Sequence, residues 1–392
     1  MTRTKMEEIR DALRSADLLI VGAGFYGMTI AERAAAHGHS VRVIDRRSHI
    51  GGNAYSYTDP RTQIEVHKYG PHLFHTNSKE VFDYLSRFTE WVPYELRVWS
   101  TSGGRTYPLP INLATISHFV GKVMTPTEAR NWVGAHAGAY DAPRNLEEKA
   151  ISLIGRPLYE AFIRGYTLKQ WQTDPTELPA DVISRLPVRF TFDNKYFNDR
   201  YQFLPKDGYT AIFERMGSAP GIEINLGIDW FDIRGSVTDL PVVFTGPIDR
   251  FFNYSEGMLG WRTLDFQPEY HPSDYQGCLV MNYPDPDVRW TRISEFRHLH
   301  PERNYAPETI IAKEYSRFAG IDDEPYYPIN TASDKRTYDA YRTLGDTTPN
   351  VIFGGRLGTY KYLDMHQAIG AALKTFDSQV LPLLDRRRAR ES

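Results

Sequence analysis

The chain has 392 residues, one cysteine and a formal net charge of −3 at neutral pH. That length predicts roughly two to three domains with a sizeable core, and the charge excludes a field that would attract nucleic acid or an anionic membrane. Cys278 has no partner for an internal disulfide, which is typical of a reducing compartment. With no secretory signal and no run of transmembrane length, we expect a cytoplasmic protein that is not inserted in a membrane.

The first predicted elements form a compact unit. An apolar strand at 18–21 leads into Gly-Ala-Gly-Phe-Tyr-Gly at 22–27, a helix at 28–37 and a second strand at 41–44 that ends on Asp45. Gly22 permits the tight turn, Gly24 lets the backbone approach a pyrophosphate, and Gly27 lets the helix pack on the strand. The diphosphate is expected at the helix N-terminus and the adenosine ribose at Asp45. The combination predicts dinucleotide binding rather than a simple glycine turn.

A second glycine pair, Gly51-Gly52, follows Asp45. Adjacent glycines allow another close backbone approach, as a long cofactor lying across the sheet requires. An ordinary Gly-Gly turn is the alternative. An acid followed by five residues and Gly-Gly resembles the large group of FAD-binding flavoproteins, and that resemblance favours FAD over NAD.

Elements typical of a nucleotide-binding domain appear again far along the chain. They are an apolar strand before a turn at 240–247, a strand followed by glycines at 351–356, and a helix from about Asp364. The predicted fold class is therefore α/β, with a discontinuous Rossmann-like FAD-binding domain and two insertions. The expected limits are 1–90, 207–255 and 340–392 for the FAD-binding domain, 111–180 for a helical domain, and 91–110, 181–206 and 256–339 for an antiparallel β-sheet substrate domain.

The insertions have their own signatures. Thr125 to Glu128 form a capping box with proline at the first helical position, Asn145 begins a similar arrangement, and Pro157 opens a third helix. Segments 98–100 and 105–107 flank a Ser-Gly-Gly turn and predict a hairpin, and further short strands are expected at 278–281, 293–296 and 309–312.

Aromatic residues and arginines alternate in three later segments, at 165–171, 184–197 and 354–365. Trp and Tyr faces suit stacking on a base or a sugar, and the planar guanidinium suits phosphate oxygens. Singly, each aromatic is more often a core residue and each arginine a surface residue. The combination indicates a nucleotide-sugar site.

These segments resemble UDP-galactopyranose mutase of the bacterial type, a flavoenzyme family. The resemblance runs from the glycine loop through His67-Lys68-Tyr69-Gly70-Pro71-His72-Leu73-Phe74-His75-Thr76 to Tyr362-Leu363-Asp364-Met365-His366. The chain departs from the family at Gln172 and at Phe203-Leu204, where glycine or a glycine-containing pair is common. Its first 16 residues have no counterpart.

The resemblance implies a role for each matching residue. Arg185, on a mobile loop, and Arg292 would hold the diphosphate, and these two with His75 are the expected catalytic residues. The expected cofactor-binding residues are Gly22, Gly24, Phe25, Gly27, Asp45, Arg46, Gly52, Asn53, His72, Arg356, Tyr362, Asp364 and Met365. The expected substrate-binding residues are Phe162, Tyr166, Thr167, Trp171, Arg185, Tyr196, Arg262, Asn282, Arg292, Tyr326 and Tyr362. No metal is expected, because no cysteine or carboxylate accompanies the histidines at ligand spacing.

The family's reaction interconverts UDP-galactopyranose and UDP-galactofuranose. Its implied chemistry is nucleophilic attack by N5 of reduced FAD on the anomeric carbon, with no net redox change. The expected partners are UDP-galactose, an external reductant such as NADPH or NADH, and further copies of the chain in a homo-oligomer. Two alternatives stay open: a flavin amine oxidase-like oxidoreductase on the same fold, and a nucleotide-sugar-binding protein without catalysis.

Overall fold

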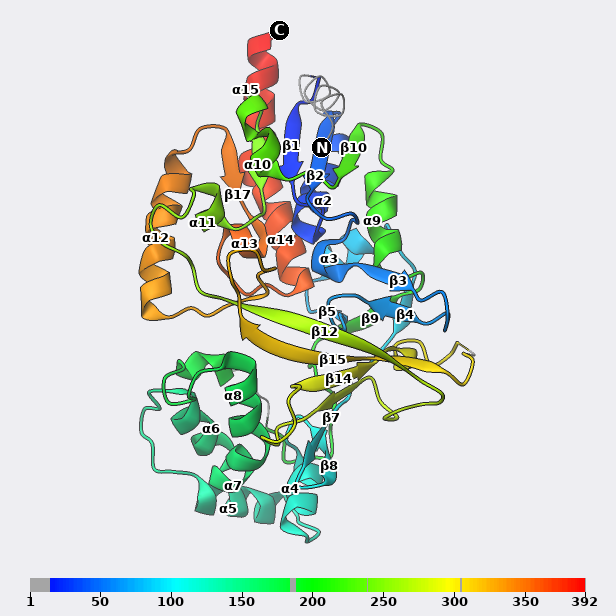
Figure 1. Cartoon of the computed structure of the whole chain (residues 1–392), viewed down its shortest axis with the longest axis vertical. Helices are drawn as coiled ribbons and strands as arrows, with labels where there is room; N and C mark the ends of the chain where they lie inside the picture. The colour runs from blue at the N-terminus through cyan, green and yellow to red at the C-terminus, as the bar shows by residue number, and fades with distance from the viewer. Residues whose placement is uncertain (1–14, 184–187, 238, 304, 392) are drawn as a thin grey trace.

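The structure is a computed structural model that describes residues 15–183, 188–237, 239–303 and 305–391. A five-stranded parallel sheet with the order β10-β2-β1-β11-β17 lies at one end of the molecule (Figure 1). Its strands are β1 (Leu18–Val21), β2 (Val41–Asp45), β10 (Ile222–Leu226), β11 (Val242–Phe244) and β17 (Val351–Phe353). The nucleotide-binding sheet is therefore discontinuous in sequence, as predicted.

Helices cover both faces of this sheet. Leu18 and Ile20 of β1 pack in one apolar cluster, whereas Leu19 and Val21 pack in another on the opposite face. The first face carries α2 (Phe25–Ala36), α9 (Tyr209–Gly217) and α14 (Met365–Thr375), and the second carries α10 (Trp230–Ile233) and α11 (Ile248–Phe251). Burial on both faces explains why β1 is a continuous apolar run and not an alternating one.

The helical insertion forms the opposite end of the molecule (Figure 1). It contains α4 (Leu113–Val120), α5 (Pro126–His136), α6 (Leu146–Ile154), α7 (Arg156–Leu158), a π-helical turn (Tyr159–Arg164) and α8 (Gly165–Trp171). The predicted capping box at Thr125 and Glu128 is present, and Asn145 caps α6 by accepting the Glu148 N–H at 2.9 Å. The helix predicted at Pro157 is confirmed, but it is divided by the π-helical turn.

A seven-stranded sheet, with the order β16-β12-β15-β14-β13-β7-β8, lies between the two ends (Figure 1). Its strands are β7 (Val98–Ser102), β8 (Arg105–Leu109), β12 (Trp261–His271), β13 (Val280–Asn282), β14 (Arg292–Glu295), β15 (Thr309–Phe318) and β16 (Tyr327–Pro328). The predicted β7–β8 hairpin is present. One pair differs from the antiparallel expectation, because β7 runs parallel to β13. The long strand β12 was not predicted.

Smaller elements complete the chain. They are β3 (Ser56–Thr58), β4 (Glu65–His67), β5 (Phe74–Thr76), β6 (Trp91–Pro93), β9 (Tyr201–Pro205), α3 (Lys79–Leu85), α12 (Ala332–Thr347), α13 (Gly355–Gly358) and α15 (Leu381–Glu391). Within the described ranges, no helix combines the length and the apolar character needed to cross a membrane. The limits of the three predicted domains stay predictions.

Candidate active site

The glycine loop has the geometry that the sequence predicts. Gly22 adopts a φ of +112°, and a Cβ there would lie 2.0 Å from the Oγ1 atom of Thr245. A Cβ on Gly27 would lie 2.0 Å from the carbonyl oxygen of Gly22, so both glycines are required by the packing of the protein itself. Phe25 begins α2 and packs on Phe213 with ring centroids 4.5 Å apart, so its side chain is in the core.

Gly24 differs from its two neighbours. Its backbone is extended (φ −86°, ψ −177°), and the nearest atom to an added Cβ would be the Cα of Gly52 at 3.7 Å. The protein therefore has room for a larger residue at this position. A cofactor pyrophosphate lying over the N-terminus of α2 would use that room. The site thus fits a dinucleotide, and Gly52 of the second glycine pair borders the same space, as predicted.

Asp45 joins the glycine loop to the following segment. Its carboxylate accepts the Ala23 N–H and the Arg47 N–H, both at 2.9 Å. A carboxylate has about four acceptor positions, so hydroxyl groups of a ribose still find acceptors. Arg46 forms a partly exposed ion pair with Glu324 at 2.8 Å.

Arg47 is an additional residue beside this site. It pairs with Glu324 at 2.7 Å, donates to Oδ1 of Asn53 at 2.9 Å and lies over the ring of Tyr69. Arg47 was not among the predicted site residues, although it directly follows the predicted Arg46.

The segment 362–365 leads into α14, which packs on the same apolar cluster as α2. Asp364 caps α14 through a capping box with Gln367, so that the helix begins at Met365 as the sequence predicts. Helix N-termini carry partial positive charge, which favours an anionic group in front of them. Arg356 donates to the carbonyl oxygens of Pro325 and Tyr326, and burial lowers the pKa of Arg356 to about 10.

The two predicted histidines have separate surroundings. Burial lowers the pKa of His72 to about 4, so its ring is neutral at neutral pH. Its Nδ1 lies 2.7 Å from the carbonyl oxygen of Gly70, which can only accept, so Nδ1 carries the proton and Nε2 is an acceptor. His75 Nδ1 contacts Asp199 at 2.7 Å, and its ring stacks on Phe197 at 3.6 Å and meets His366 edge-on.

A second cluster lies on the seven-stranded sheet. Asn282, Arg292 and Glu314 are opposite one another on β13, β14 and β15, so they form one row across the sheet. Arg292 donates to the hydroxyl of Tyr166 on α8, and its Nε lies 3.5 Å from the buried Glu314 carboxylate. A partly buried guanidinium oriented in this way suits a phosphate group. Glu314 was missed by the sequence analysis, because only strand register places it beside Arg292.

Tyr327, and not the predicted Tyr326, lies beside this cluster. Tyr327 is opposite Arg262 in the sheet and interacts electrostatically with Arg292 and Glu314. Its ring stacks on Tyr362 with centroids 5.7 Å apart. Tyr326 instead turns toward Tyr69, where it is buried. The two tyrosines are adjacent in the sequence, so residue type alone does not distinguish them.

Two further predicted substrate residues, Asn282 and Tyr196, have groups that a ligand could contact. The Oδ1 atom of Asn282 is buried and has no hydrogen-bond partner among the described residues. Such an orphaned acceptor is costly unless a ligand or water supplies a donor. Tyr196 is 42% exposed and meets Phe197 edge-on, so part of its side chain is accessible from solvent.

Helix α8 carries the predicted nucleoside residues. Thr167 is buried and Trp171 is half-buried, whereas Phe162 lies in the core between Tyr107 and Phe119 and does not line an open site. The helix ends at Gln172 in the left-handed region, with a φ of 48°. Glycine is the residue that adopts this conformation most easily, which explains why glycine is common here in the family that the sequence resembles.

Arg262 does not reach the cluster. It is fully buried, its Nε donates to the carbonyl oxygen of Gln170 at 3.0 Å, and its guanidinium also contacts Gln172 and Ser316. Arg262 therefore binds the C-terminal end of α8, where a cation is favourable. Arg185, predicted to bind the diphosphate, lies outside the described residues.

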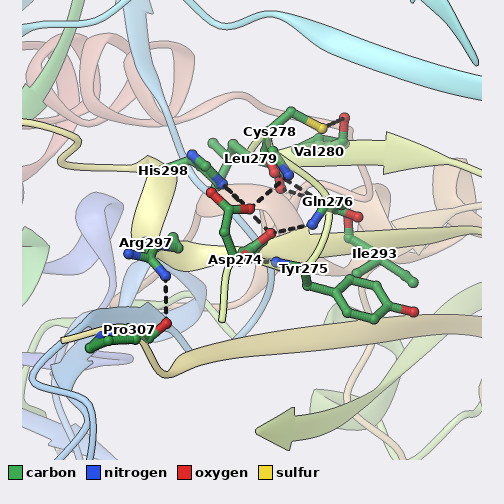
Figure 2. A network of polar contacts seen from close by, with 12 residues as sticks. Asp274, Tyr275, Gln276, Cys278, Leu279, Val280, Ile293, Arg297, His298 and Pro307 are labelled. Atoms are coloured by element: carbon green, nitrogen blue, oxygen red, sulfur yellow. Dashed lines mark hydrogen bonds and ion pairs between the residues drawn. The ribbon is translucent and has the colours of Figure 1, made fainter. Parts of the chain in front are cut away.

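Two groups of side chains have the composition of metal ligands. His75, Asp364 and His366 form one group, and Asp274, Glu295 and His298 form the other, each with ligand atoms within 4.8 Å of one another. Figure 2 shows Asp274 and His298 of the second group in a polar network around the segment before β13. Glu295 accepts the Tyr275 and Gln276 N–H groups, and Asp274 accepts the Gly277 N–H, so these carboxylates fasten the segment.

Cys278 lies in the same network, where burial raises the pKa of its thiol to about 12. A thiol with that pKa is protonated at neutral pH and is a poor nucleophile.

The network should make stability dependent on pH through His298. Burial by itself would lower the pKa of His298, but Glu295 and Asp274 outweigh it and raise the pKa above 6.5. The stabilising contribution is therefore complete below pH 6.5 and is lost as the pH rises through the raised value. We expect His298→Gln to lower the thermal midpoint more at pH 5.5 than at pH 9. Equal decreases at both pH values would contradict this assignment.

The fold and the glycine loop together define a nucleotide-binding α/β protein with a Rossmann-like domain, and residues 20–88 match the model of an NAD(P)-binding Rossmann-like domain. Residues 161–362 match the model of the UDP-galactopyranose mutase family. A probable UDP-galactopyranose mutase of Klebsiella pneumoniae is 44% identical over 93% of this chain and 95% of its own length. The chain therefore belongs to the UDP-galactopyranose mutase family, and FAD is the cofactor that agrees with this membership and with the second glycine pair.

Two further relatives bear on this family. A dTDP-fucopyranose mutase of Escherichia coli is 40% identical over 91% of this chain and 96% of its own length. A crystal structure of a reduced UDP-galactopyranose mutase covers 94% of both chains with a TM-score of 0.70 at 14% identity, which supports the fold. The family thus includes enzymes named for different nucleotide sugars.

Proposed function

We propose that the protein is a flavin-dependent mutase that interconverts UDP-galactopyranose and UDP-galactofuranose without net redox change. The observation that carries this proposal is the position of the segment 362–365 between the two clusters. Tyr362 stacks on Tyr327, which interacts with Arg292, and Asp364 caps α14, which packs against α2, the helix that follows the glycine loop. A sugar joined to a diphosphate at Arg292 would therefore lie next to the flavin.

Different residues would bind the substrate and the cofactor. Arg292, with Tyr166, Tyr327 and Tyr362 around it, would bind the diphosphate and stabilise its charge when the anomeric bond breaks. Gly24, Gly52, Asp45, the N-terminus of α14 and Arg356 would hold FAD. Reduced FAD supplies the nucleophilic nitrogen, and an external reductant such as NADPH or NADH would keep it reduced. His72 offers Nε2 as an acceptor and keeps its proton on Nδ1.

Some predicted roles rest on the resemblance alone. Arg185 is proposed as the second diphosphate-binding arginine, and His75, held by Asp199, as a residue at the flavin and sugar. Trp171, Thr167 and Tyr196 are proposed contacts of the nucleoside and phosphates. Homo-oligomerisation and a cytoplasmic location stay predictions.

Product analysis with oxidised and reduced enzyme tests the proposal. UDP-galactofuranose should be converted by dithionite-reduced enzyme through many turnovers per electron pair, and not by the oxidised enzyme. Oxygen consumption with amines would instead support the oxidoreductase alternative, and tight UDP binding without conversion in both redox states would support the binding protein.

Because one relative is a dTDP-fucopyranose mutase, the same experiment should also compare the UDP-galactose pair with the dTDP-fucose pair as substrates. The two nucleotide sugars differ at the ribose 2′-hydroxyl, at the base methyl group and at the sugar C6 hydroxyl. We expect kcat/KM to favour the UDP-galactose pair. A higher kcat/KM for the dTDP-fucose pair would mean that the protein is a mutase of the same reaction class with a different substrate.

A further inference from the structure

Lys169 is a half-buried cation that the proposed chemistry does not use. Its ammonium group lies on α8 within hydrogen-bond reach of four backbone carbonyl oxygens, those of Tyr283, Asp285, Val288 and Trp290. All four belong to the loop 283–291, which connects β13 to β14. An ammonium group has three hydrogens to donate, so the loop surrounds the cation as a ring of acceptors.

A second contact joins the same helix to the same loop. Gly165 begins α8 in a helical conformation (φ −68°, ψ −36°), and a Cβ there would lie 2.1 Å from the carbonyl oxygen of Pro284. Gly165 and Lys169 are four residues apart, so they lie on one face of the helix. The backbone of the loop therefore rests directly on α8 at Gly165 and is held by the Lys169 ammonium.

The two ends of this loop carry proposed substrate residues. Asn282 ends β13 and Arg292 begins β14. Tyr166, the hydrogen-bond partner of Arg292, follows Gly165 on α8. The position of the loop on the helix thus sets where the Arg292 guanidinium lies relative to Tyr166.

We propose that Lys169 and Gly165 form a lock that positions Arg292 and Asn282 for the diphosphate of the substrate, with Lys169 as a positioning residue that does not touch substrate. This inference rests on the proposed function, because it assumes that Arg292 binds the diphosphate. Burial lowers the pKa of Lys169 to about 8, and Asp285, Asp287 and the ring of carbonyl oxygens favour the ammonium form.

The first test replaces the cation. Lys169→Met keeps the aliphatic chain and removes every donor, so the loop loses its hydrogen bonds to a charged group. UDP binding to the holoenzyme should weaken roughly ten- to hundredfold, with FAD content and thermal midpoint close to wild type. Lys169→Arg should recover part of the affinity. Lys122→Met, which removes an exposed lysine paired with Glu128, is the control and should leave UDP binding unchanged.

The second test moves the loop without removing charge. Gly165→Ala forces a Cβ against Pro284 and should also weaken UDP binding. Gly134→Ala on α5 is its control, because a Cβ there meets nothing within 4 Å. If Lys169→Met destabilises the whole protein, the result of Gly165→Ala decides the proposal. Wild-type UDP affinity in both the Gly165→Ala and the Lys169→Met variants would overturn the lock.

A double-mutant cycle separates the lock from the proposed function. If Lys169 acts through Arg292, Lys169→Met should weaken UDP binding much less in an Arg292→Ala background than in the wild type. Equal losses in both backgrounds would contradict positioning through Arg292. If Arg292→Ala alone leaves UDP binding unchanged, the proposed diphosphate site is wrong, whatever Lys169 does.

Discussion

Replacing Arg292 with alanine should lower the conversion of the nucleotide sugar by roughly 30-fold to several-thousand-fold while FAD stays bound. The expected loss follows from the cost of removing one partner of a buried, charge-assisted contact, about 2–5 kcal/mol. The guanidinium is fixed before the diphosphate arrives, because Tyr166 accepts one of its hydrogen bonds and Glu314 lies 3.5 Å from its Nε. Steady-state kinetics of the reduced enzyme measure the effect.

Two comparisons make the Arg292 prediction specific. Arg292→Lys should recover only part of the activity, because an ammonium group cannot reproduce the planar fork of donors. Arg289→Ala removes an exposed arginine from the loop 283–291, just before Arg292, and should leave the activity close to wild type. Wild-type activity of Arg292→Ala would show that the substrate site lies elsewhere, even with the fold unchanged. The same loss is expected for Arg185→Ala on the basis of the sequence.

Gly24→Ala should expel FAD from a protein that still folds. The extended backbone at Gly24 accepts any residue, and an added Cβ would have no neighbour closer than 3.7 Å in the protein. Only a pyrophosphate in contact with that backbone would collide with the new methyl group. We expect FAD affinity to fall roughly a hundredfold or more, which corresponds to about 2.8 kcal/mol. Flavin absorbance after purification, and titration of the apoprotein with FAD, measure this loss.

Gly27 supplies the contrasting variant. A Cβ at Gly27 collides with the carbonyl oxygen of Gly22 whether or not a cofactor is present, so Gly27→Ala should destabilise the apoprotein as well. The thermal midpoint of the apoprotein should therefore fall for Gly27→Ala and stay close to wild type for Gly24→Ala. Full FAD occupancy in Gly24→Ala would contradict the placement of the pyrophosphate.

The local elements were predictable because neighbouring residues determine them. The apolar strand β1, the positive φ of Gly22 and the second strand ending on Asp45 form one short unit, in which β1 pairs with β2 and Asp45 accepts the Ala23 N–H. The capping boxes at Thr125 and Asp364 likewise satisfy orphan N–H groups with side chains only three residues away. The start of α14 could therefore be predicted from the sequence, although its packing against α2 could not.

The long strand β12 and the choice between the two tyrosines could not be predicted in this way. β12 pairs with β15 across a large sequence separation, and only its first four residues are all buried, so it lacks a clear alternating pattern. Adjacent residues of an extended chain point to opposite sides, so the pairing of Tyr327 with Arg262 decides which tyrosine joins Tyr362. A shift of one residue would have exchanged Tyr326 and Tyr327.

Residue types and spacings were enough to predict that this protein binds a dinucleotide, that its nucleotide-binding sheet is assembled from separated segments, and which family it resembles. These conclusions depend on residue types at fixed spacing within single elements. The folded chain was needed to show that Arg262 binds the end of α8, that Glu314 lies next to Arg292, and that Lys169 is surrounded by the loop 283–291. Those contacts join residues far apart in the chain, and strand register and helix docking, which no local pattern encodes, bring them together.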